Sequence, residues 1–140
     1  MLEVVNLTET KIDTKFLQKV AQAAFAVLGI KEEVSLVFIG DAKMKELNKK
    51  YRGKNKTTDV LSFKELSEIF ICLSVAKKQA KLLKTGLKSE LTRLLTHGIV
   101  HLQGYDHAKS AREAERMFEV EEKILLKLRL KANWNEFKAN

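Results

Sequence analysis

Short apolar runs that are rich in β-branched residues and too brief for helices predict four β-strands along the chain. The runs are LEVVNL at 2–7, EEVSLVFIG at 32–40, TTDVLSF at 57–63 and EIFICLS at 68–74. Only the stretch KELS separates the third run from the fourth. We therefore expect a sheet of about four strands.

Five longer segments repeat apolar residues every three or four positions, which is the spacing of an amphipathic helix. They cover residues 13–29, 41–52, 74–84, 89–104 and 110–128. Each begins at a residue that can cap a helix N-terminus: Asp13, Asp41, Ser74, Ser89 and Ser110. Glu113 adds a capping box to the last of these. Gly29 and Gly104 stand where a left-handed residue would end a helix.

The order of these elements, β-α-β-α-β-β-α-α-α, predicts the α+β class. We expect a single mixed β-sheet of about four strands packed with about five helices, with residues 1–140 forming one domain. No apolar stretch approaches the roughly 20 residues that span a bilayer. The opening MLEVVNLTETK lacks the charge and apolar core of a signal peptide. The expected location is therefore the cytoplasm, without a membrane.

Composition narrows the candidate partners of the chain. A formal net charge of +8 favours a polyanion, and nucleic acid is the commonest such partner. The single cysteine, Cys72, excludes an internal disulfide and a four-cysteine zinc site. Its apolar neighbours indicate a buried strand thiol.

All three histidines of the chain lie within HGIVHLQGYDH at residues 97–107. His97 and His101 are four residues apart, so a helix places both imidazoles on one face. Gly104 permits a sharp turn, and His107 follows three residues later. Three imidazoles at such a corner can hold a divalent cation and leave one tetrahedral position open, as in catalytic zinc sites.

The spacing of this motif is also that of the metzincin peptidases, which makes peptide hydrolysis an alternative. Those enzymes have a glutamate base directly after the first histidine, whereas this chain has Gly98. A glycine cannot remove a proton, and it weakens a helix by roughly 1 kcal/mol relative to alanine. We therefore expect Gly98 to mark a close approach to another part of the fold.

The histidine motif resembles the H-G-x-x-H-L-x-G-Y-D-H signature of the YbeY family, bacterial metal-dependent endoribonucleases of ribosomal RNA maturation. LNKKYRGKNKTTDVLSF at 47–63 resembles a second family block, and SELTRLLTHG at 89–98 resembles the lead into the histidines. The chain departs from the pattern at three places: Thr57 replaces a usual proline, and Ser67 and Glu68 replace a commoner Gly-Asp pair.

The resemblance implies one Zn²⁺ ion held by His97, His101 and His107, with His97 also in the catalytic set. It further implies an essential role for Arg52, whose planar fork can hold two phosphate oxygens. Lys54 and Lys56 extend a positive path for RNA, although they could equally belong to a solvated loop.

Three neighbouring residues keep two interpretations each. Asp106 could orient a ligand imidazole or capture a substrate proton, or it could cap the following turn. Asp59 could hold Arg52 or cap its own turn. Tyr105 could stack an RNA base or pack beneath the site. In the C-terminal tail, Trp134 and Phe137 are expected to anchor the end of the chain.

The resemblance, together with the metal motif and the positive charge, implies a zinc-dependent endoribonuclease that cuts single-stranded RNA, in particular precursor 16S ribosomal RNA, during ribosome biogenesis and quality control. The ribosomal subunit and ribosome-associated proteins are candidate partners. An RNA- or ribosome-binding module with a structural zinc is the main alternative, and a metallopeptidase is the third. The sequence names no general base.

Overall fold

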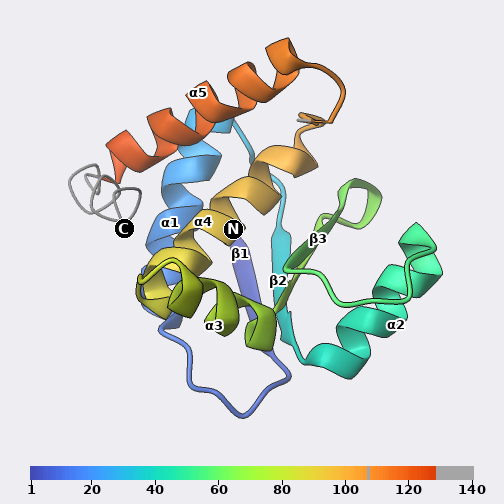
Figure 1. Cartoon of the computed structure of the whole chain (residues 1–140). Helices are drawn as coiled ribbons and strands as arrows, with labels where there is room; N and C mark the ends of the chain where they lie inside the picture. Colours follow the sequence, from blue (N-terminus) through green and yellow to red (C-terminus); the bar gives the residue numbers. More distant parts are fainter. Residues whose placement is uncertain (107, 129–140) are drawn as a thin grey trace.

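The computed structural model describes residues 1–106 and 108–128. Within them, four strands form one sheet (Figure 1). The strands are β1 (Leu2–Asn6), β2 (Val34–Ile39), β3 (Val60–Phe63) and β4 (Glu68–Cys72). Their order is β1-β2-β4-β3. The β1–β2 and β2–β4 pairs are parallel, and the β3–β4 pair is antiparallel. The sheet is therefore mixed, as predicted.

Five α-helices accompany this sheet within the described residues, which confirms the α+β class. They are α1 (Thr14–Leu28), α2 (Asp41–Arg52), α3 (Leu73–Leu82), α4 (Leu87–Leu102) and α5 (Ala111–Lys127). A short 3-10 helix, η1 (Lys64–Leu66), joins β3 to β4. None of the helices in this part of the chain is long and apolar enough to cross a membrane.

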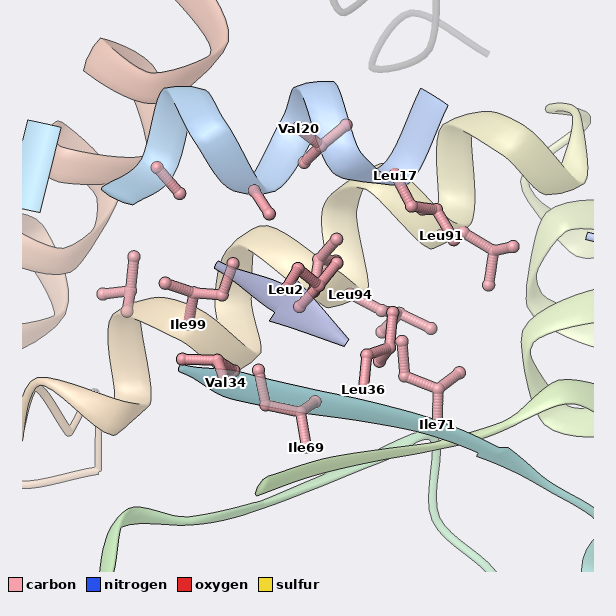
Figure 2. Close-up of a cluster of buried hydrophobic side chains, with 14 of the residues drawn as sticks. Leu2, Leu17, Val20, Val34, Leu36, Ile69, Ile71, Leu91, Leu94 and Ile99 are labelled. Atoms are coloured by element: carbon pink, nitrogen blue, oxygen red, sulfur yellow. The ribbon is translucent and has the colours of Figure 1, made fainter. Parts of the chain in front are cut away.

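The main core lies between the sheet and the helix pair α1 and α4 (Figure 2). Leu36 and Ile71 point from the sheet toward Leu94 on α4, and all three side chains are buried. A smaller core on the other face of the sheet contains Ile39 and Met44, which brings α2 against that face. The two cores hold α2 and α4 on opposite sides of the strands, and the ends of both helices reach the cleft described below.

Several predicted helix boundaries are confirmed. Asp13 accepts a hydrogen bond from the Phe16 backbone N–H at 3.1 Å, and Gly29 ends α1 with a φ of 70°. The Ser110 hydroxyl accepts from the Glu113 backbone N–H at 3.1 Å, which starts α5. Gly104, two residues beyond the end of α4, has a φ of 90°, the left-handed conformation that its position predicted.

Three predicted caps are wrong. Gly40 caps α2, and the Asp41 carboxylate instead accepts hydrogen bonds from Ser74 Oγ and from Cys72 Sγ, the latter at 3.3 Å. Ser74 therefore lies inside α3, which starts one residue earlier, after Cys72. The hydrogen bond between Asp41 and Ser74 joins the starts of α2 and α3, so neither side chain caps its own helix.

The third error concerns α4, which begins at Leu87 after Gly86 rather than at Ser89. Ser89 lies in its first turn. Cys72 is fully buried at the end of β4, as predicted, and burial raises the pKa of its thiol. Trp134 and Phe137 lie outside the described residues, so their predicted anchoring role stays a prediction.

Candidate metal centre and basic cleft

A cleft of about 1070 Å³ opens between the C-terminal end of α2, strand β3 and the exposed face of α4. Eight of the nine candidate site residues line it: Arg52, Lys54, Lys56, Asp59, His97, His101, Tyr105 and Asp106. The ninth, His107, lies outside the described residues. The structure thus brings together two segments that are about 40 positions apart in the sequence, 52–59 and 97–106.

The two described histidines meet at the wall of this cleft. His97 Nε2 and His101 Nε2 are 3.0 Å apart, and the ring planes make an angle of 77°. Two imidazoles on one tetrahedral zinc ion have nitrogens about 3.3 Å apart, given Zn–N distances of 2.0–2.1 Å. The pair is therefore close to the spacing that a shared cation requires. Within residues 1–106 and 108–128, no third His, Cys, Asp or Glu completes a metal cluster with them.

Glu121 on α5 is a site residue that sequence reasoning missed. Its Oε1 atom lies 2.8 Å from His97 Nδ1. When Nδ1 carries the proton and donates it to this carboxylate, Nε2 presents its lone pair toward His101. A carboxylate behind a ligand histidine is the usual support of metal-bound imidazoles, so this contact fits a metal at the pair. Glutamates are frequent along α5, and nothing in the sequence distinguished this one.

Gly98 brings α4 against the sheet at the level of the histidines. A Cβ atom at this position would lie 2.9 Å from Ile69 Cγ2 and 3.3 Å from Ser62 Oγ. Ser62 Oγ also donates a hydrogen bond to the Gly98 carbonyl at 3.1 Å. The close approach expected from the sequence is thus confirmed, and it fixes the distance between the histidine pair and β3.

The segment that carries Arg52 is held at its ends. Arg52 is the last residue of α2 and is exposed, and Gly53 follows with a φ of 68°. The buried Asn48 donates a hydrogen bond from Nδ2 to the carbonyl of Lys56 at 2.8 Å. This bond holds the loop just before Thr57, where the resemblance led us to expect proline. Asn48 therefore limits the freedom that a missing proline would give.

The carboxylates of Asp59 and Asp106 each accept a hydrogen bond from the backbone of their own turn, and their proposed roles toward Arg52 and a ligand imidazole stay predictions. Asp59 Oδ1 accepts from the Val60 backbone N–H at 2.7 Å, and Oδ2 accepts from Gln79 Nε2 at 3.3 Å. Asp106 Oδ1 accepts from the Ala108 backbone N–H at 2.9 Å. Tyr105 is partly buried and packs against the main core. All three nevertheless line the cleft.

An ion pair in the cleft wall is a second feature that sequence reasoning missed. The Glu90 carboxylate is fully buried, and its two oxygens accept from Arg93 Nε at 3.1 Å and Arg93 Nη2 at 2.6 Å. Glu90 raises the pKa of the Arg93 guanidinium. Arg93 lies four residues before His97 and lines the same cleft. The helical spacing of 93, 97 and 101 was the available signal.

Comparison with known proteins places this fold and motif in one group. The family model described as Endoribonuclease YbeY matches residues 3–129. The chain belongs to the YbeY family. An Endoribonuclease YbeY of Aquifex aeolicus is 39% identical over 135 residues, which cover 89% of this chain and 90% of that protein. Endoribonuclease YbeY of Thermodesulfovibrio yellowstonii is 47% identical over 106 residues, or 69% of this chain and 67% of the relative.

A solved structure agrees with this membership. The solution structure of a Thermotoga maritima protein superposes with a TM-score of 0.67 at 25% identity and covers 99% of this chain and 95% of that one. The departures from the YbeY pattern can also be placed. Ser67 has a φ of 50°, the left-handed conformation in which glycine carries no steric cost. Within the described residues, neither Ser67 nor Glu68 lines the cleft.

Proposed function

We propose that this chain is a metal-dependent endoribonuclease that hydrolyses phosphodiester bonds in single-stranded RNA. The observation that carries the proposal is the His97–His101 pair, with Nε2 atoms 3.0 Å apart in the wall of a basic cleft. Membership of the YbeY family and the endoribonuclease names of the relatives support it. Maturation of 16S ribosomal RNA, with ribosome quality control, is the proposed pathway, and the cytoplasm is the proposed location.

The charge of the cleft suits a nucleic acid backbone. Six cationic side chains line it: Arg52, Lys54, Lys56, Lys64, Arg93 and Lys109. Phosphate contacts supply most of the affinity for RNA and make it depend on salt. A single strand can present its backbone and splayed bases to an open cleft, whereas a duplex is stiff and holds its bases stacked. Single-stranded RNA is therefore the proposed substrate, and the ribosomal subunit and its proteins are the proposed partners.

In this proposal His97, His101 and His107 hold one Zn²⁺ ion. When bound, the ion supplies a water of lowered pKa and a Lewis acid for the phosphoryl oxygens. Glu121 keeps the His97 ring oriented through the 2.8 Å contact to Nδ1. Arg52 faces the cleft from the end of α2, where its guanidinium can neutralise the charge that develops on the phosphate. Asp106 and Tyr105 line the same cleft and are candidate substrate contacts.

The peptidase alternative loses further support from the packing around Gly98. A Cβ atom at this position would lie 2.9 Å from Ile69 Cγ2, so a glutamate there would require either Ile69 or the helix to shift. A zinc-stabilised RNA-binding module remains as an outcome of the test below.

The proposal is tested with purified protein, one single-stranded RNA and the matching duplex, before and after chelation and after return of Zn²⁺. We expect cleavage of the single strand that chelation abolishes and zinc restores, while circular dichroism shows an unchanged fold. Unfolding on chelation, together with no cleavage by the zinc-loaded protein, would instead identify a binding module. Turnover of unstructured peptides would revive the peptidase.

A further inference from the structure

Arg93 lies about one turn before His97, on the side of α4 that carries the two histidines. Arg93, His97 and His101 follow each other at intervals of four residues, so their side chains project from the same side of the helix. Successive members are separated by about 6 Å along the helix axis. All three line the cleft. A strand that has its reacting phosphate at the histidine pair and runs along this side of α4 would therefore bring a neighbouring phosphate to Arg93.

The guanidinium of Arg93 is held in place before any substrate arrives. The two carboxylate oxygens of Glu90 accept hydrogen bonds from its Nε and Nη2 atoms. Gln79 Oε1 accepts a further hydrogen bond from Nη2 at 3.4 Å. The side chain keeps 33% of its surface exposed. Among the described residues, Nη1 has no hydrogen-bond partner. The contacts fix one edge of the planar group and leave the Nη1 edge available.

This arrangement requires burial of the Glu90 carboxylate, whose side chain is 0% exposed. Taking a carboxylate out of water is expensive, and a buried ion pair is often no more stable than apolar residues of similar size. Stability alone therefore gives no reason for an ion pair rather than apolar residues at this place. What an apolar pair cannot do is present an oriented cation at the wall of the cleft.

Arg52, the cation that the sequence favoured, is placed differently. It is exposed at the end of α2, and its guanidinium forms no hydrogen bond or ion pair with the part of the chain that the structure describes. Arg52 must lose side-chain freedom on binding, whereas Arg93 has already lost it. Among the described residues, the cleft thus combines one cation without such contacts, Arg52, with one that Glu90 and Gln79 hold in place, Arg93.

We propose that Arg93 is a second phosphate contact, which binds the phosphate next to the one at the histidine pair and favours strands over single phosphodiesters. The proposal rests on the proposed function, since it takes RNA as the ligand of this cleft. The competing explanation is that Arg93 only neutralises Glu90. The two differ in what happens to RNA when both charges are removed together.

The decisive variant is therefore the double substitution Glu90→Gln with Arg93→Gln. It removes one negative and one positive charge, so the net charge of the protein stays the same. Two amides can also replace the ion pair with neutral hydrogen bonds, which avoids an unpaired buried carboxylate. The control is Arg116→Gln on α5, which is exposed, does not line the cleft and lowers the net charge by one.

The first measurement is the binding of a fluorescent single-stranded RNA to chelated protein at several salt concentrations. We expect the double variant to bind about tenfold more weakly and its salt slope to fall by about 0.7, the contribution of one phosphate contact in a single strand. Arg116→Gln should keep the wild-type slope. A folded double variant with wild-type affinity and slope would show that Arg93 neutralises Glu90 and does not contact the RNA.

The second measurement can be made on the wild-type protein alone, so it remains informative if the double substitution prevents folding. Neutral methylphosphonates replace, one at a time, the phosphates on either side of the central phosphate of a short single-stranded RNA. We expect one of the two replacements to weaken wild-type binding about tenfold and to have no further effect on the double variant. No loss with either replacement would overturn the proposal. Because binding is measured without metal, absent cleavage with a normal Arg93 effect would refute the nuclease but not the phosphate contact.

Discussion

Removing the carboxylate of Glu121 should weaken metal binding without unfolding the protein. Glu121 Oε1 lies 2.8 Å from His97 Nδ1, and through this contact the ring keeps Nε2 directed at His101. Glu121→Ala deletes the acceptor. Glu121→Gln keeps an oxygen at nearly the same place and removes only the charge. The two variants separate the orientation of the ring from the electrostatic support of the carboxylate.

The size of the effect follows from the exposure of the pair. Loss of a carboxylate behind a ligand histidine typically weakens metal binding by about 10- to 100-fold, or about 1.4–2.7 kcal/mol. The His97 and Glu121 side chains are 27% and 22% exposed, so water can partly replace the lost contact. We therefore expect the dissociation constant for Zn²⁺ to rise about tenfold in Glu121→Ala and by less in Glu121→Gln.

The assay is competition for Zn²⁺ against a chromophoric chelator, with circular dichroism as a check on folding. Glu119→Gln is the control, because it removes the same charge from an exposed position on the same helix. It should bind zinc like the wild type. A folded Glu121→Ala protein whose zinc affinity stays within twofold of the wild type would refute the idea that Glu121 supports the metal site.

Three further predictions concern packing, pH and the phosphate clamp. Gly98→Val should lower the free energy of unfolding in urea by about 1–3 kcal/mol, because its Cβ would lie 2.9 Å from Ile69 Cγ2; unchanged stability would contradict this packing. Hydrogen bonds from Ser74 and Cys72 hold the pKa of Asp41 below its ordinary value of 3.8. The stability from this lowered pKa is present above pH 4 and is lost as the pH falls through the folded-state pKa. Asp41→Asn should therefore flatten the acid limb of a pH–stability curve, and an unchanged limb would exclude this group as its source. Arg52→Ala should keep the zinc content and reduce RNA cleavage at least tenfold, and normal cleavage would remove the clamp.

The fold was largely predictable because its determinants are local. Alternating and helical patterns found every strand and α-helix of the described chain, and Asp13, Gly29 and Ser110 marked boundaries through bonds to residues within a few positions. The caps failed where a distant partner competed. Asp41 and Ser74 are 33 positions apart and bind each other, which no local rule detects.

The residues of the site also divide into those that local sequence predicts and those that depend on tertiary packing. The i,i+4 spacing of His97 and His101 requires only a helix, and the structure places the two nitrogens together as that spacing implies. Glu121 comes from another helix, and its contact depends on how α5 packs across α4. Arg93 could have been found from its spacing, but the burial of Glu90, which fixes its orientation, follows only from the packed helix bundle.

The most direct test of the central claim is the zinc content of the wild-type protein and of His101→Ala, measured by elemental analysis after equal loading and dialysis. Each sample is then assayed for cleavage of the same single-stranded RNA. The account predicts about one zinc ion per wild-type chain with cleavage, and little zinc and no cleavage in a folded His101→Ala variant. Full zinc content or undiminished cleavage in that variant would contradict it.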